Sequence, residues 1–279
     1  DAIGGIATHD LTLAEAEDLE SLARKKSLLF GVTYTYTGYP MARHARDLVR
    51  QGALGELRMV NVEYPQDWLT TRLEITDHKQ ASWRGDPAQT GRVNSLGDIG
   101  THVENMASFI SGLTIKRLCA RLDSLVPGRE LDDNARIMVD FEGGASGLFW
   151  MSQVAVGHNN GLKIRVFGDK GGLEWRQEEP ETLFLHHRDG NSEILHRGRA
   201  GMSIANNPLV RVPAGHPEGY LEAFANIYRG FVAALKAKQG SSLATPIHEY
   251  PGIEDGVRGM RFIERCLESA GGGGVWVDW

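Results

Sequence analysis

Two ionisable side chains near the middle of the chain stand at a spacing that chemistry can use. Asp98 and His102 lie in the run GDIGTHVENM at residues 97–106. If this run is helical, the two side chains lie one turn apart on the same face. A neighbouring apolar stripe with helical spacing would pack that helix against a core. The stripe consists of Ile99, Val103, Met106 and Ile110. The pair would then project from a rigid element.

Spacing alone leaves other interpretations of this pair open. An Asp at a helix start often acts as a cap or a first-turn charge, and a His on a helix often only packs. A carboxylate and an imidazole at this spacing can also be half of a metal site. No third ligand can be identified from spacing in the sequence, so we predict no metal.

Length and composition indicate a globular protein. The chain has 279 residues, 41% of them hydrophobic, which suits one large or two smaller domains. A formal net charge of -6 provides no overall basic field, which argues against nucleic acid as a partner. No run of 18 apolar residues and no secretory signal is found. Cys119 and Cys266 are lone thiols, which suits a reducing compartment. We therefore expect a cytoplasmic protein without a membrane span.

The first quarter of the chain alternates helical and extended patterns. Thr12 and Glu15 form a capping box ahead of a helix predicted at about 13–26. The β-rich apolar run at 28–36 predicts a strand, and Pro40 opens a second helix that ends near Gly52, with basic residues on its polar side. Such an order is typical of α/β layers.

The rest of the chain is richer in strands. A long strand is predicted at 56–64, and a helix at 98–111 follows an irregular stretch at 65–92. Turn signals then separate seven predicted strands. These are 116–122, 135–141, 145–156, 162–167, 172–177, 182–187 and 193–197. Helices at 218–238 and 253–269 and a short strand at 275–277 close the chain. The pattern predicts an α/β (α+β) fold with one large, mostly antiparallel sheet backed by helices.

Several local motifs resemble one family of sugar dehydrogenases. It is named after glucose-fructose oxidoreductase, inositol 2-dehydrogenase and the protein MocA, and is abbreviated Gfo/Idh/MocA. The resemblance runs from Thr12 to Trp279. The motifs are YTGYP at 36–40, GALGE at 52–56, GDIGTH at 97–102, GDKGGLEW at 168–175 and HPEGYLEAF at 216–224.

The resemblance implies both a fold and a reaction. Members join an N-terminal Rossmann domain, which binds NAD or NADP, to a C-terminal domain whose open sheet carries substrate residues and oligomer contacts. Asp98 and His102 match the family's Asp-x-x-x-His pair. His102 would take a hydroxyl proton from a sugar or cyclitol while a hydride leaves for the nicotinamide, with Asp98 binding the substrate and raising the basicity of the imidazole. A homodimer or homotetramer formed through the open sheet is implied as well.

The chain departs from the family pattern at its start. Members begin with a strand, a glycine-rich turn and a helix, and carry a Glu-Lys-Pro motif before the helix that here follows Thr12. Residues 1–10 contain no lysine, and no GxGxxG occurs in the chain. We therefore expect residues 1–54 to be a remnant of the nucleotide-binding domain, without its phosphate loop and catalytic lysine. Residues 55–279 would form the substrate-binding and oligomerisation domain.

Further site candidates follow from the resemblance. Tyr36 and Tyr39 match the nicotinamide side of the cleft, although their rings could simply pack. The candidates for holding a sugar combine flat aromatic faces with polar groups, and anchoring of their own loop is the competing account for most of them. They are Gln66, Trp68, Trp83, Arg84 and His216.

Three functions are compatible with these patterns. The first is an NAD(P)-dependent dehydrogenase acting on a sugar or cyclitol, present here as a truncated chain. The second is a non-catalytic sugar-binding or assembly module, because a pocket and a sheet could remain without the cofactor half. The third is a glycoside hydrolase or lyase on the same fold. Substrate identity and the choice between NAD and NADP stay open.

Overall fold

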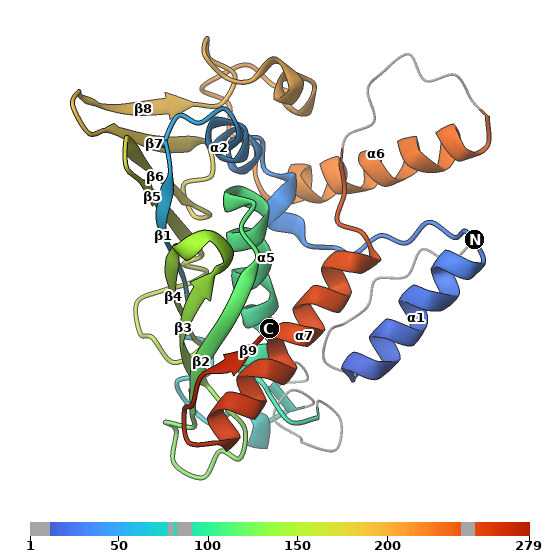
Figure 1. Ribbon diagram of the computed structural model, residues 1–279, viewed down its shortest axis with the longest axis vertical. Helices are drawn as coiled ribbons and strands as arrows, with labels where there is room; N and C mark the ends of the chain where they lie inside the picture. The colour runs from blue at the N-terminus through green and yellow to red at the C-terminus, as the bar shows by residue number, and fades with distance from the viewer. Residues whose placement is uncertain (1–11, 78–80, 83–90, 241–248) are drawn as a thin grey trace.

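A computed structural model of the chain describes residues 12–77, 81–82, 91–240 and 249–279. One large sheet forms one side of the molecule, and helices cover a single face of it (Figure 1). The sheet has nine strands in the order β8-β7-β6-β5-β1-β4-β3-β2-β9. No helix of the described part is long and apolar enough to cross a membrane.

The centre of the sheet is β1 (Leu57–Pro65), which is parallel to β4 (Ser146–Ser152) and antiparallel to β5 (Lys163–Gly168). Every other pairing is antiparallel. The remaining strands are β2 (Ile115–Asp123), β3 (Asn134–Phe141), β6 (Gly171–Arg176), β7 (Thr182–His187), β8 (Ser192–His196) and β9 (Val277–Asp278). The predicted fold class is thus confirmed.

Alternation along the strands decides which face the helices cover. On β1, Val60 and Val62 are fully buried beneath the helices, whereas Met59, the residue before Val60, lies on the opposite face and is exposed. On β4, Phe149 is buried and Leu148 is 51% exposed. The buried apolar side chains lie on the covered face, which therefore holds the core. Each of them contributes roughly 1.5–3 kcal/mol to the stability of the fold.

Three helices pack on the covered face: α2 (Pro40–Arg50), α5 (Thr101–Ser111) and α7 (Ile253–Gly271). Farther from the sheet, α1 (Leu13–Lys25) packs against α7, and α6 (Tyr220–Lys238) packs against η1, a short 3-10 helix (Thr35–Gly38). The predicted capping box is present, because the Thr12 hydroxyl accepts the Glu15 N–H at 3.3 Å and the Glu15 carboxylate accepts the Thr12 N–H at 2.8 Å.

Two elements differ from the sequence-based expectation. The run at 28–36 was expected to be a strand, but residues 28–34 form no ladder with any described residue and η1 follows. A strand needs a neighbour to accept its N–H groups, and here one backbone bond joins Val32 N–H to Pro251 O at 2.9 Å. The sequence placed basic residues on the polar side of α2, and in the structure three of them, Arg43, His44 and Arg46, are buried.

Candidate active site

The helix that carries Asp98 starts with an unusual turn. Residues Leu96–Gly100 (η3) adopt π-helical geometry and run directly into α5, so the predicted single helix has two parts. Such π turns occur often at functional sites. A side chain at Gly100 would come within 2.9 Å of the Leu96 and Met151 side chains, so this glycine lets the turn lie close to β4.

A buried carboxylate from the β2–β3 connection holds this turn. Asp132 accepts hydrogen bonds from the backbone N–H groups of Asn94 and Leu96, each at 2.7 Å. The first N–H groups of a helix have no partner inside the helix, so the carboxylate satisfies them. Burial raises the pKa of Asp132 to about 6, although these two hydrogen bonds act in the opposite direction.

Asp98 and His102 line one pocket of about 410 Å³. Both side chains are half-buried, and Ile99 from the same turn forms part of the floor. The other lining residues come from η1, β1, the connections around β5 and β6, and the start of α6. They are Tyr36, Tyr64, Gln66, Asn160, Gln177 and Tyr220. The pair that spacing singled out therefore faces a shared cavity.

A buried amide fixes the orientation of Asp98. Gln153, which is 0% exposed, donates from Nε2 to Asp98 Oδ2 at 2.7 Å. The other end of the Gln153 amide accepts from Asn94 Nδ2 at 3.3 Å. Hydrogen bonds to a charged group are stronger than those between neutral groups. Asp98 is thus tied to the end of β4 as well as to its own helix.

Three tyrosine rings surround the His102 imidazole. The ring centroids of Tyr36, Tyr34 and Tyr64 lie 4.9, 5.4 and 6.4 Å from the imidazole centroid. All three rings meet the imidazole nearly edge to face, an arrangement that aromatic pairs prefer. The rings therefore restrict how the imidazole can turn.

Asn160 joins the polar side chains of the pocket into one network. Its Oδ1 accepts from Tyr64 Oη at 2.7 Å and from Gln66 Nε2 at 2.9 Å. Its Nδ2 donates to Gln177 Oε1 at 2.7 Å and to Tyr36 Oη at 3.3 Å. A side-chain amide has two acceptor sites and two donors, and all four are in use. Asn160 therefore fixes the opposite wall of the pocket.

The tyrosines of this wall stay protonated at neutral pH. Burial raises the pKa of Tyr36 to about 12 and raises the pKa of Tyr64 well above its ordinary value. A phenol in that state can share a hydrogen bond with a ligand hydroxyl but is a poor base. Among the ionisable groups that line the pocket, the imidazole and the carboxylate are the ones suited to accept a proton.

The other sequence-predicted site residues divide into four groups. Gln66 and Tyr36 line the pocket, as described above. Trp68 supports it from outside by donating from Nε1 to Gln66 Oε1 at 3.0 Å, and Tyr39 accepts from Gln177 Nε2 at 3.1 Å. His216 is exposed and does not line the pocket. Trp83 and Arg84 lie outside the described residues.

Sequence reasoning missed Tyr64, Gln153, Asn160 and Gln177, and named Tyr220 only as part of a motif. Tyr64 is the last inward position of β1, so its alternation was a usable signal. Asn160 and Gln153 lie in the connection after β4, where no periodic pattern exists. Among the described residues, no group of three His, Cys, Asp or Glu side chains could hold a metal ion.

The chain is similar to known proteins in sequence and in fold. A family described as the GFO/IDH/MocA C-terminal domain matches residues 42–174. An uncharacterized oxidoreductase of Bacillus subtilis, YfiI, is 35% identical over 271 residues, which cover 96% of this chain and 69% of the relative.

Two solved structures are also similar over 96% of the chain. An inositol dehydrogenase homolog from Azotobacter vinelandii, complexed with NAD+, is 38% identical, has a TM-score of 0.91 and is covered over 70% of its length. An oxidoreductase from Sinorhizobium meliloti is 44% identical, has a TM-score of 0.84 and is covered over 70%. A further structure of the Azotobacter protein holds NADH and myo-inositol, at 36% identity and a TM-score of 0.87.

Proposed function

The chain belongs to the Gfo/Idh/MocA family of oxidoreductases, and on that premise we propose that it serves the NAD(P)-dependent oxidation of a sugar or cyclitol hydroxyl. The observation that carries this proposal is the central pocket. It places a carboxylate and an imidazole opposite a wall of amide and phenol groups. A polyol presents many hydroxyls, each a donor and an acceptor, and this wall offers both kinds of partner.

In the proposed reaction the chain's own residues bind the polyol and move one proton. His102 takes the proton of the reacting hydroxyl as general base. Asp98, held by Gln153, accepts a hydrogen bond from the substrate and favours the protonated imidazole. When bound, NAD or NADP would supply the acceptor for the hydride that leaves the same carbon. The network around Asn160 orients the remaining hydroxyls.

We propose the same division into domains that the sequence suggests, with residues 1–54 belonging to a nucleotide-binding domain and 55–279 to the substrate domain. Two observations support it: residues 28–34 run without a ladder partner among the described residues, and the chain has no glycine-rich phosphate loop. Calorimetry tests the division, because these 279 residues should bind a sugar without binding NAD. Tight binding of NAD by this chain alone would contradict it.

Self-association through the uncovered face of the sheet is part of the proposal. Met59, Met138 and Leu148 are 41%, 49% and 51% exposed on that face. Exposed apolar patches of this kind often mark interfaces between protein copies. A homodimer or homotetramer would bury them.

The function is tested with the natural polypeptide that contains this chain. We expect NAD or NADP to be reduced in the presence of an inositol or a pyranose, as measured by nicotinamide absorbance. We expect His102→Ala to lose this turnover. His186→Ala is the matched control, because it removes an exposed imidazole from β7. Equal rates for His102→Ala and the unaltered protein would refute the role of the base.

Two other outcomes would favour the alternatives. Sugar binding by calorimetry, without reduction of any nicotinamide, would support the non-catalytic module. Release of a new reducing sugar from a glycoside would support a hydrolase or lyase. Silence with every pair of cofactor and polyol would overturn the dehydrogenase proposal.

A further inference from the structure

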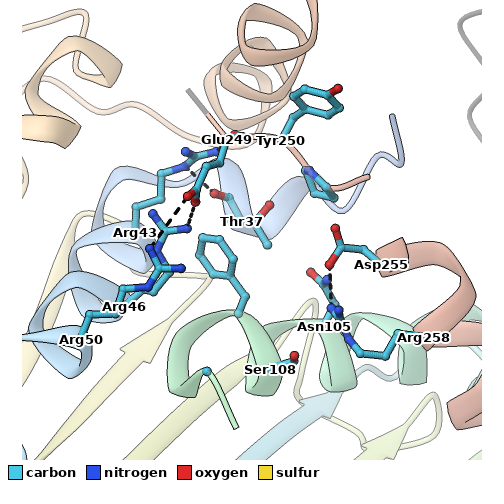
Figure 2. Close-up of a pocket in the computed structure, with 13 residues that line it drawn as sticks. Thr37, Arg43, Arg46, Arg50, Asn105, Ser108, Glu249, Tyr250, Asp255 and Arg258 are labelled. Atoms are coloured by element: carbon cyan, nitrogen blue, oxygen red, sulfur yellow. Dashed lines mark hydrogen bonds and ion pairs between the residues drawn. The ribbon is translucent and has the colours of Figure 1, made fainter. Parts of the chain in front are cut away.

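A second pocket, of about 330 Å³, lies between α2, α5 and the start of α7. It shares no lining residue with the pocket that contains Asp98 and His102. Figure 2 shows the arginines of α2 along one side and Asn105, Asp255 and Arg258 on the other. The lining side chains carry four guanidinium groups against two carboxylates, those of Glu249 and Asp255.

The most buried of these arginines has no carboxylate partner among the described residues. Arg43 is 3% exposed and donates to two neutral groups, the Thr37 carbonyl at 2.7 Å and the Glu249 carbonyl at 2.6 Å. Burial and the nearby Arg46 lower the pKa of Arg43 to about 10, so the group stays charged at neutral pH. Two backbone carbonyls thus orient the Arg43 guanidinium group, but no carboxylate of a described residue contacts it directly.

Two further arginines face the Glu249 carboxylate at the mouth. Arg46 forms an ion pair with Glu249, and Arg50 Nη1 lies 3.9 Å from Glu249 Oε1. Arg46 Nε is also 3.7 Å from Asp47 Oδ1. Burial acts against ionisation of Glu249, but the surrounding guanidinium groups outweigh it and lower the pKa of this carboxyl. The α2 side of the pocket thus holds three guanidinium groups against the two carboxylates of Glu249 and Asp47.

The opposite side of the pocket contributes a neutral donor. Asn105 is 2% exposed and lines the pocket. An amide on a pocket wall can donate a hydrogen bond to a ligand oxygen. The charge of the neighbouring Arg258 is already matched by Glu104 at 2.8 Å and Asp255 at 2.7 Å.

We infer that this pocket binds a small molecule through a compact oxyanion group, a carboxylate or a phosphate, held between Arg43, Arg50 and Asn105. Arginine forks match the oxygens of both groups. The chain itself shows the chemistry, because the Glu249 carboxylate already occupies the Arg46 side of the mouth. Phe109, Tyr250 and Pro251 give apolar walls for the rest of the ligand.

Glu249 would compete with the ligand for the same guanidinium groups. Its side chain is 59% exposed, so it can turn toward solvent when a second anion arrives. This competition predicts that removing the Glu249 charge strengthens binding, whereas removing the Arg50 charge weakens it. The site does not depend on nicotinamide chemistry, so its test is independent of the proposed oxidation.

The test measures anion binding by the 279-residue chain. Inorganic phosphate and malonate are titrated by calorimetry at constant ionic strength, with chloride as the balancing anion. We expect one site, with Arg50→Gln weakening and Glu249→Gln strengthening the affinity by about three- to tenfold each. Tighter binding of phosphate would identify a phosphate ester as the ligand class, and tighter binding of malonate an organic acid; either supports the site.

The matched control is Arg58→Gln, which removes one exposed positive charge from β1, outside the pocket. Its affinity should equal that of the unaltered chain. Circular dichroism establishes that each variant is folded. The absence of binding for both anions would overturn the inference, as would equal affinities for all three variants.

Discussion

Replacing Gln153 should slow turnover although this side chain does not line the pocket. The change Gln153→Leu keeps the approximate size of a fully buried side chain and removes the donor to Asp98 Oδ2 at 2.7 Å. Asn94 Nδ2 keeps a second acceptor, the Asp132 carbonyl at 3.2 Å. Gln66 Oε1 loses the 3.4 Å hydrogen bond from Gln153 but keeps the one from Trp68 Nε1 at 3.0 Å, so little else is left unsatisfied. The effect therefore reports mainly on Asp98.

The size of the effect follows from the type of bond. A hydrogen bond to a charged group contributes about 1.5–3 kcal/mol, which corresponds to about 10- to 150-fold in kcat/KM if the bond is needed in the transition state. The assay is steady-state reduction of the nicotinamide by the natural polypeptide, over a range of pH. Denaturation in urea establishes that the variant is still folded.

A second substitution separates positioning from packing. Gln153→Glu preserves shape but places a carboxylate against Asp98, and two such groups in one buried site repel each other. The loss should exceed that of Gln153→Leu at neutral pH and should shrink as the pH falls and one carboxyl is protonated. If Gln153→Leu keeps kcat/KM within twofold of the unaltered protein while folded, the reasoning about Asp98 is wrong.

Three further predictions concern stability and assembly. Met106→Ala should lower the free energy of unfolding by roughly 2–5 kcal/mol in urea, whereas His102→Ala should change it little. Burial raises the pKa of Asp132 from an ordinary 3.8 to about 6, so the folded protein should lose about 3 kcal/mol of stability as the pH increases from about 4 to 6. Urea titrations should show this slope for the unaltered protein and not for Asp132→Asn. Leu148→Lys should shift any oligomer toward monomer in light scattering, with Lys170→Glu, outside that patch, as control.

The features predicted correctly from the sequence are those set by neighbours along the chain. The capping box at Thr12 and the alternation on β1 depend on residues a few positions apart, and both are present. The parallel pairing of β1 with β4 joins segments more than 80 residues apart, which no local pattern specifies. The run at 28–36 has strand propensity, but a strand exists only with a partner, and none of the described residues supplies one.

The same distinction applies to the candidate site. Asp98 and His102 could be found because one helical turn brings them together. The groups that would determine how the pair works come from elsewhere: Gln153 fixes the carboxylate and Asp132 anchors the turn, while Asn160 fixes the opposite wall. Gln153 and Asn160 belong to the β4–β5 connection and Asp132 to the β2–β3 connection, and such connections have no sequence period to follow. Gln153 and Asp132 do not line the pocket, so a mutation of either should alter catalysis without removing a contact to the substrate, which spacing alone could not indicate.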